Sequence, residues 1–106
     1  MAKYLVTASY TAEGTKGLRK DGGTKRRDVA RKAIESVNGK LDVFYFCFGE
    51  TDVLLIADFP DAPSAAALSL AIGSTGAVRL STMPLLTPEE IDKACGKKTA
   101  YKAPGV

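Results

Sequence analysis

Two arginines carry the clearest chemical signals in the sequence, because a guanidinium group can hold a carboxylate or a phosphate at two points. The first, Arg26, lies in the cationic run Lys25-Arg26-Arg27, directly after Gly22-Gly23-Thr24. Cations in the first turn of a helix oppose its dipole, so something must offset them. Either Asp21, Asp28 and counterions neutralise them, or free amides and these side chains form an anion site under a mobile glycine-rich stretch.

The position of Arg26 on the predicted helix favours an inward orientation, since it lies on the same side as Ala33 and Val37. We therefore expect Arg26 to be at least partly buried. We also expect it to be bonded to an acidic side chain or to a bound anion.

The second arginine, Arg79, alternates with Ser81 and Met83 on one face of a predicted strand, opposite Val78 and Leu80. It is expected to face a cleft or a subunit interface. Its role is either a contact between subunits or the anchor of a small acidic ligand.

Three further side chains complete the candidate ligand-binding set. Asp52 opens a strand after a tight turn, where it either caps backbone amides or places a carboxylate at the mouth of a cleft. Glu50 is either a solvated turn residue or the partner of Asp52 in an acid/base pair. Tyr45 shares a strand face with Val43 and Cys47, and its hydroxyl needs a hydrogen-bond partner if it is buried in the core.

Several kinds of chemistry are excluded or disfavoured. The chain has no histidine, which removes Ser-His and Cys-His nucleophile pairs, a histidine haem ligand and the common zinc sites. The apolar neighbours of Cys47 argue against a reactive thiolate. The segment Gly17 to Thr24 is no phosphate loop, because Gly23 stands where the lysine is required. We expect no metal and no cofactor, and assign no catalytic residue.

Length and composition indicate one small globular domain with a modest core. The chain has 106 residues and a net charge of +3, which is too small to favour a nucleic-acid partner, although the positive charges cluster between Lys16 and Lys32. It has no run of about 18 apolar residues, so no membrane partner is expected.

The two cysteines of the chain form no spaced framework. We expect reduced thiols and a cytoplasmic protein.

The pattern of elements predicts four strands and three helices. A strand at Lys3 to Tyr10 precedes Thr11 to Gly23, which has four glycines and reads as a long loop or a broken helical turn. A helix starts at Thr24 and is ended by Gly39 in a left-handed conformation. Three further strands are expected, at Leu41 to Phe48, Asp52 to Phe59 and Ala77 to Leu85. A second helix is expected at Ala65 to Ile72, capped by Asp61 and stopped by Gly76. A third helix, with a capping box, is expected at Thr87 to Cys95.

The order strand, helix, strand, strand, helix, strand predicts an α+β fold of the ferredoxin-like βαββαβ type, an antiparallel sheet with helices on one face. The second strand then lies at an edge. Because Leu41 to Phe48 is apolar on both faces, it would expose aromatic groups and unpaired backbone, and association with another copy of the chain would cover them. The domain is expected to span residues 1–96, followed by a basic tail at 97–106.

At the predicted hairpin the sequence resembles the GYD domain family, whose signature is Gly-Tyr-Asp. The matching stretch is Phe48-Gly49-Glu50-Thr51-Asp52, with Thr51 where the family has tyrosine. The resemblance continues through Lys25-Arg26, Asn38-Gly39-Lys40, Ala66-Ala67-Leu68 and Gly76-Ala77-Val78-Arg79. It implies a dimeric α+β barrel, in which the sheets of two copies pack face to face.

Two functions follow as hypotheses. The leading one is a small-molecule-binding or regulatory homo-oligomer with a pocket between the sheet and the helices. The alternative is a cofactor-independent enzyme, of the monooxygenase or isomerase type, that acts on a small organic acid or an aromatic compound. The two differ in whether ionisable side chains with perturbed pKa values converge in the pocket.

Overall fold

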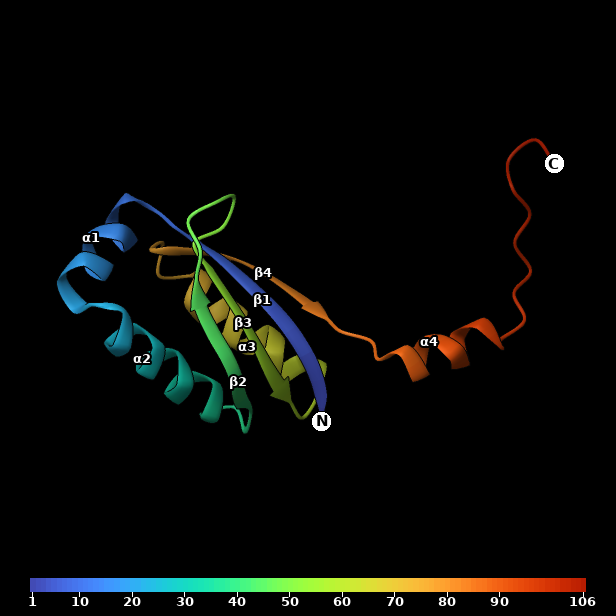
Figure 1. Cartoon of the computed structure of the whole chain (residues 1–106), viewed down its shortest axis with the longest axis horizontal. Helices are drawn as coiled ribbons and strands as arrows, with labels where there is room; N and C mark the ends of the chain where they lie inside the picture. The colour runs from blue at the N-terminus through green and yellow to red at the C-terminus, as the bar shows by residue number, and fades with distance from the viewer.

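The computed structural model describes residues 1–106 and has four strands and four helices. In chain order they are β1 (Ala2–Tyr10), α1 (Ala12–Asp21), α2 (Gly23–Glu35), β2 (Lys40–Phe46), β3 (Val53–Phe59), α3 (Ala62–Gly73), β4 (Val78–Pro84) and α4 (Pro88–Cys95). The strands form one antiparallel sheet in the order β2-β3-β1-β4 (Figure 1). The predicted ferredoxin-like α+β fold is confirmed, and β2 is an edge strand as expected.

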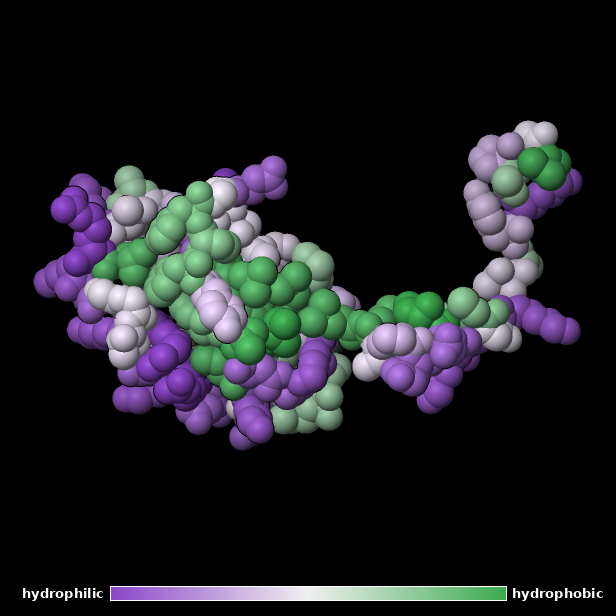
Figure 2. Space-filling model, in the orientation of Figure 1, coloured by the Kyte–Doolittle hydropathy of each residue, from purple (hydrophilic) through white to green (hydrophobic).

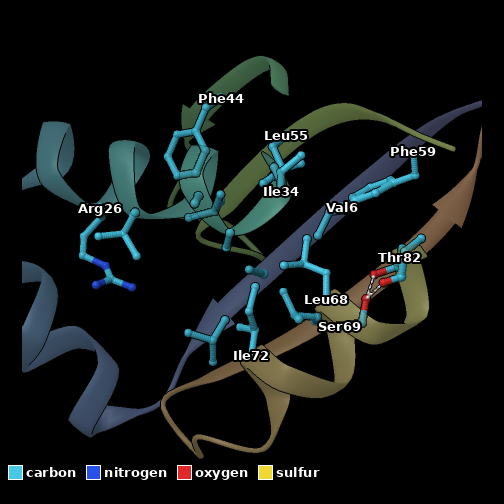
Figure 3. Close-up of a pocket in the computed structure, with 18 of the residues that line it drawn as sticks. Val6, Arg26, Ile34, Phe44, Leu55, Phe59, Leu68, Ser69, Ile72 and Thr82 are labelled. Atoms are coloured by element: carbon cyan, nitrogen blue, oxygen red, sulfur yellow. Dashed lines mark hydrogen bonds between the residues drawn. The ribbon is translucent and has the colours of Figure 1, made fainter. Parts of the chain in front are cut away.

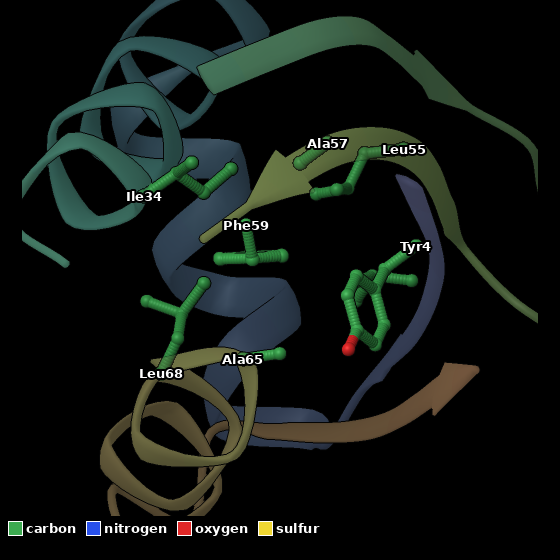
Figure 4. Packing of buried hydrophobic residues seen from close by; sticks show 8 residues of the cluster. Tyr4, Ile34, Leu55, Ala57, Phe59, Ala65 and Leu68 are labelled. Atoms are coloured by element: carbon green, nitrogen blue, oxygen red, sulfur yellow. The ribbon is translucent and has the colours of Figure 1, made fainter. Parts of the chain in front are cut away.

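The core lies between the sheet and the helices α2 and α3. Alternate residues of the central strands β1 and β3 face the helices, because successive side chains of a strand point to opposite faces. The buried cluster is made of Tyr4, Val6, Ile34, Leu55, Ala57, Phe59, Ala65 and Leu68. Figure 4 shows Ile34 of α2 and Leu68 of α3 on either side of Phe59. The ring of Tyr4 meets that of Phe59 edge to face, with centroids 5.5 Å apart.

The prediction for Thr11 to Gly23 was wrong in part, because this segment forms the helix α1. Thr11 caps the helix by accepting a hydrogen bond from the amide of Gly14, and its own amide donates to the carbonyl of Ala77. Gly14 is required by packing: a Cβ there would lie 2.1 Å from the Ala77 oxygen. Only Gly22, with φ of 85°, breaks the helical path. The glycines of this segment therefore do not indicate a loop: Gly14 allows a close contact with Ala77, and Gly22 forms the kink between α1 and α2.

The predicted ends of two helices need a similar correction. The left-handed residue after α2 is Asn38, with φ of 62°, and not Gly39. Gly39 is needed because a Cβ would lie 2.7 Å from Ile34 Cγ2 and 2.9 Å from the Asp58 carbonyl oxygen. Helix α3 ends at Gly73, and Gly76, with φ of 76°, lies in the turn before β4.

Helix α4 forms as predicted and projects from the end of β4, with the tail beyond it (Figure 1). The capping box is complete: the Glu90 amide donates to the Thr87 hydroxyl at 3.1 Å, and the Thr87 amide donates to the Glu90 carboxylate at 3.0 Å. All residues from Leu86 to Val106 are exposed. None of the four helices has the length and apolar character needed to cross a membrane.

Removal of the Phe59 side chain tests this account of the core. The ring is 0% exposed, so Phe59→Ala should lower the free energy of unfolding by about 3–5 kcal/mol, measured by urea denaturation. Leu70→Ala is the matched control, because Leu70 is 74% exposed and its loss should change stability by less than about 0.5 kcal/mol. Equal effects of the two substitutions would contradict the proposed packing.

Candidate functional site

A pocket lies between the sheet and the two helices that cover it. It has a volume of about 120 Å³, and 16 of its 19 lining residues are hydrophobic (Figure 3). The lining comes from the helix-facing sides of all four strands and from α2 and α3. Alanines at positions 30, 33 and 65 line the space. Their methyl groups are too short to fill the gap between the helices, which explains why the core stays open here.

The polar groups of the pocket lie at its two sides (Figure 3). Arg26 of α2 marks one side, and Ser69 of α3 with Thr82 of β4 marks the other. The two hydroxyl oxygens are 2.7 Å apart, and Ser69 also donates to the Ala65 carbonyl at 3.0 Å. Because a hydroxyl has a single proton, Thr82 must donate to Ser69. Both hydroxyl protons are therefore used in hydrogen bonds within the chain, but both hydroxyl oxygens can still accept a hydrogen bond from a ligand.

Arg26 is partly buried and lies near an acidic side chain, as its place on the helix predicts. Its side chain is 33% exposed, and Nη1 lies 3.5 Å from Asp21 Oδ2. The other oxygen of Asp21 lies 3.5 Å from Lys25 Nζ, so one carboxylate serves two cations. An ion pair of this length is weak, and most donors of the guanidinium have no carboxylate partner. Arg26 can therefore bind an anion without breaking a strong internal contact.

Tyr10, at the end of β1, connects Arg26 to Asp52. Its phenol lies close enough to Arg26 for the guanidinium to lower the pKa of the phenol, and its backbone amide donates to Asp52 Oδ2 at 2.8 Å. Burial raises the pKa of the Tyr10 phenol, and the nearby charge of Asp52 raises it further, whereas Arg26 lowers it. Burial has the largest effect, so Tyr10 stays a neutral phenol that can donate a hydrogen bond.

Asp52, directly before β3, links β1 to Cys47, the residue that follows β2. Besides its bond to the Tyr10 amide, its own amide donates to the Ala8 carbonyl at 2.8 Å, and its carbonyl accepts from the Cys47 amide at 2.8 Å. The carboxylate thus caps a backbone amide, which is one of its two predicted roles. The amide belongs to β1 and not to the turn that precedes Asp52.

The other three candidate residues lie away from the pocket. Tyr45 is 65% exposed on the face of the sheet that no helix covers, where Arg79 also lies, exposed and without an ion pair in the chain. Glu50 is exposed in the hairpin, and its carbonyl accepts a bond from the Ser9 hydroxyl at 3.3 Å. The structure therefore brings Arg26 and Asp52 together around Tyr10, and leaves Tyr45, Arg79 and Glu50 elsewhere.

Sequence reasoning did not identify Tyr10, Ser69 and Thr82 as site residues. Tyr10 continues the alternation of Tyr4, Val6 and Ala8 on β1, which was a usable signal that it faces the helices. Ser69 and Thr82 gave no such signal, because their contact depends on how α3 crosses β4.

The effect of Arg26 on Tyr10 is open to direct measurement. Because the folded-state pKa of Tyr10 is raised, the contribution of its neutral phenol to the free energy of unfolding is fully present below the ordinary pKa of tyrosine. That contribution is lost as the pH rises through the folded-state pKa. Arg26→Met removes a group that lowers this pKa, so Tyr10 should titrate at a still higher pH. Titration of phenolate absorbance measures the shift, with Tyr10→Phe to assign the signal.

Lys25→Met is the matched control for that titration, because Lys25 pairs with the same Asp21 carboxylate but is not a pocket residue. It should leave the Tyr10 titration unchanged. If Arg26→Met and Lys25→Met both titrate like the native protein, Arg26 does not influence the phenol of Tyr10.

Comparison with known proteins agrees with the hairpin signature. A model of the GYD domain family matches residues 4–95. Comparison with curated proteins and with solved structures gives no significant match. The match covers all four strands and α1 to α4; β1 alone begins before it. Since it spans most of the chain, the protein belongs to the GYD domain family.

Proposed function

We propose that the protein is a homo-oligomer that binds a small carboxylate with an apolar or aromatic body in the pocket between α2, α3 and the sheet. The observation that carries the proposal is the position of Arg26 at the side of a pocket whose lining is mostly hydrophobic. The pocket volume of about 120 Å³ approaches the volume of about 150 Å³ of an engineered apolar cavity that binds benzene. A single six-membered ring is therefore the largest apolar body that suits the pocket.

The polar groups suit the charged end of such a ligand. A guanidinium can hold both oxygens of a carboxylate, and the neutral phenol of Tyr10 can donate to one of them. The apolar lining excludes water and so strengthens these bonds. At the opposite side, the oxygens of Ser69 and Thr82 could accept a bond from a hydroxyl on the ring.

The pocket supports binding more strongly than it supports catalysis. Tyr10 and Arg26 are the only ionisable side chains among its lining residues. Arginine stays protonated in proteins, and a phenol with a raised pKa is a poor base at neutral pH. A monooxygenase-like or isomerase-like reaction would need a general base that these residues do not supply.

Self-association is supported by the uncovered face of the sheet. Figure 2 shows hydrophobic side chains gathered over this face and continuing onto α4. Apolar areas of this kind mark interaction sites on soluble proteins. The resemblance to dimeric α+β barrels suggests a second copy of the chain as the partner. Both cysteines are free, which fits a reducing compartment such as the cytoplasm.

Calorimetric titration with benzoate and with uncharged benzyl alcohol tests the ligand class. The native protein should bind benzoate, and Arg26→Met should weaken that binding at least about tenfold, or 1.4 kcal/mol, with little change for benzyl alcohol. Arg27→Met is the matched control, since Arg27 pairs with Asp28 and does not line this pocket.

Ala33→Phe provides a second check, because a ring at this lining position should fill the pocket and abolish binding of both compounds. The proposal fails if the native protein binds no small carboxylate. It also fails if Arg26→Met binds benzoate as tightly as the native protein does.

A further inference from the structure

The hydroxyl pair Ser69 and Thr82 offers a ligand acceptor oxygens but no proton. Both residues are partly buried and line the pocket. Ser69 donates its proton to the Ala65 carbonyl at 3.0 Å, and Thr82 donates its proton to Ser69 at 2.7 Å. Because each hydroxyl oxygen has two lone pairs, one on Ser69 and both on Thr82 stay free. A ligand group that bonds this pair must therefore bring a proton of its own.

The rest of the pocket wall gives a ligand hydroxyl no comparable partner. Apart from this pair, the only lining side chains with a nitrogen or oxygen atom are Arg26 and Tyr10. Figure 3 shows Arg26 across the pocket from Ser69 and Thr82. A hydroxyl that is buried against apolar side chains loses its bonds to water without replacing them, which costs free energy. The pair thus sets the position in the pocket where a ligand hydroxyl is favourable.

The register of β1 and β4 gives the separation of the two polar ends. Tyr10, beside Arg26, pairs with Val78, and Val6 pairs with Thr82. The two ends are therefore four residues apart along the strands, which corresponds to roughly 13 Å. A benzene ring with a carboxylate and a para hydroxyl has roughly 6 Å between its outer oxygens, and a hydrogen bond of about 3 Å at each end brings the span to about 12 Å. The two lengths agree.

Other ligands of similar size fit the same geometry less well. A hydroxyl ortho or meta to the carboxylate is directed at the apolar walls and does not reach the hydroxyl pair. A ligand of two rings exceeds the pocket volume of about 120 Å³. A flexible chain of the same length loses conformational freedom on binding, whereas a ring is already rigid. The distance and the lining together favour one aromatic ring with para substituents.

We propose that the pocket is specific for an aromatic acid with a hydroxyl group para to its carboxylate, and that Ser69 and Thr82 select this hydroxyl. The inference rests on the function proposed above and narrows its ligand class. The carboxylate bonds Arg26 and Tyr10, and the ligand hydroxyl donates to Thr82, whose oxygen has the larger number of free lone pairs. A halogen or an ether at the para position has no proton to donate, so it gains no such bond.

Calorimetric titration of the native protein with four aromatic acids tests the specificity. The native protein should bind para-hydroxybenzoate at least about fivefold more tightly than benzoate and para-fluorobenzoate. The fluorine occupies a similar space but donates no hydrogen bond, so it separates the effect of the proton from that of size. Meta-hydroxybenzoate should bind no more tightly than benzoate, because its hydroxyl meets the apolar wall.

The double variant Ser69→Ala/Thr82→Val assigns the preference to the hydroxyl pair. It keeps the shape of both side chains closely and removes both oxygens, so it should bind para-hydroxybenzoate no more tightly than para-fluorobenzoate. Ser74→Ala/Thr7→Val is the matched control: Ser74 also donates to a carbonyl of α3, at 2.9 Å, and neither residue lines the pocket. The control should keep the preference of the native protein.

The outcomes separate this specificity from the proposed function. A native protein that binds none of the four acids contradicts both. A native protein that binds benzoate, but binds para-hydroxybenzoate no more tightly than para-fluorobenzoate, retains the proposed function and overturns the specificity. A preference that Ser69→Ala/Thr82→Val retains, or that the control variant loses equally, overturns the role of the pair. The ligand series on the native protein decides the specificity even if the double variant does not fold.

Discussion

The packing of α2 and α3 against the central strands β1 and β3 is the constraint on which the rest of the structure depends. Ile34 from α2 and Leu68 from α3 hold the helices against Phe59, and all three side chains are buried. The same helix faces also carry Ala30, Ala33 and Ala65, whose short side chains do not fill the space between the helices and the sheet. The pocket is a direct result: it is the part of the core that short side chains leave open, and α2 brings Arg26 to its side.

The same alternation that fills one face of the sheet leaves the other face uncovered. Strand β3 shows the division clearly, with Val53, Leu55, Ala57 and Phe59 buried and Leu54, Ile56 and Asp58 partly exposed between them. The two faces of the sheet thus differ in chemistry. The helix-covered face encloses a small, mostly apolar pocket with a cation at its side, whereas the open face exposes apolar side chains to solvent.

The sequence predicted the features that depend on local patterns. Runs of apolar, aromatic and β-branched residues between turn signals identified the four strands, and the pair Thr87 and Glu90 identified α4. The helical period of 3.6 residues predicted that Arg26 points inward. The errors concern glycine and long-range contacts. Gly14 and Gly39 are required by neighbours distant in the chain, Ala77 and Asp58, so their local context wrongly suggested a loop and a left-handed cap. The contact between Ser69 and Thr82 and the position of Tyr10 beside Arg26 depend on where the helices cross the sheet, which local patterns do not encode.

Binding of a small carboxylate in the helix-covered pocket is the central claim, and methyl NMR during a benzoate titration tests its location most directly. The account predicts shifts at the methyl groups of Ile34, Leu68 and Ile72, which line the pocket, and none at Leu70, Leu86 and Ile91, which are exposed. Shifts confined to the exposed methyl groups, or to Leu5, Leu54 and Ile56 on the open face, would contradict it, as would an unchanged spectrum at saturating benzoate.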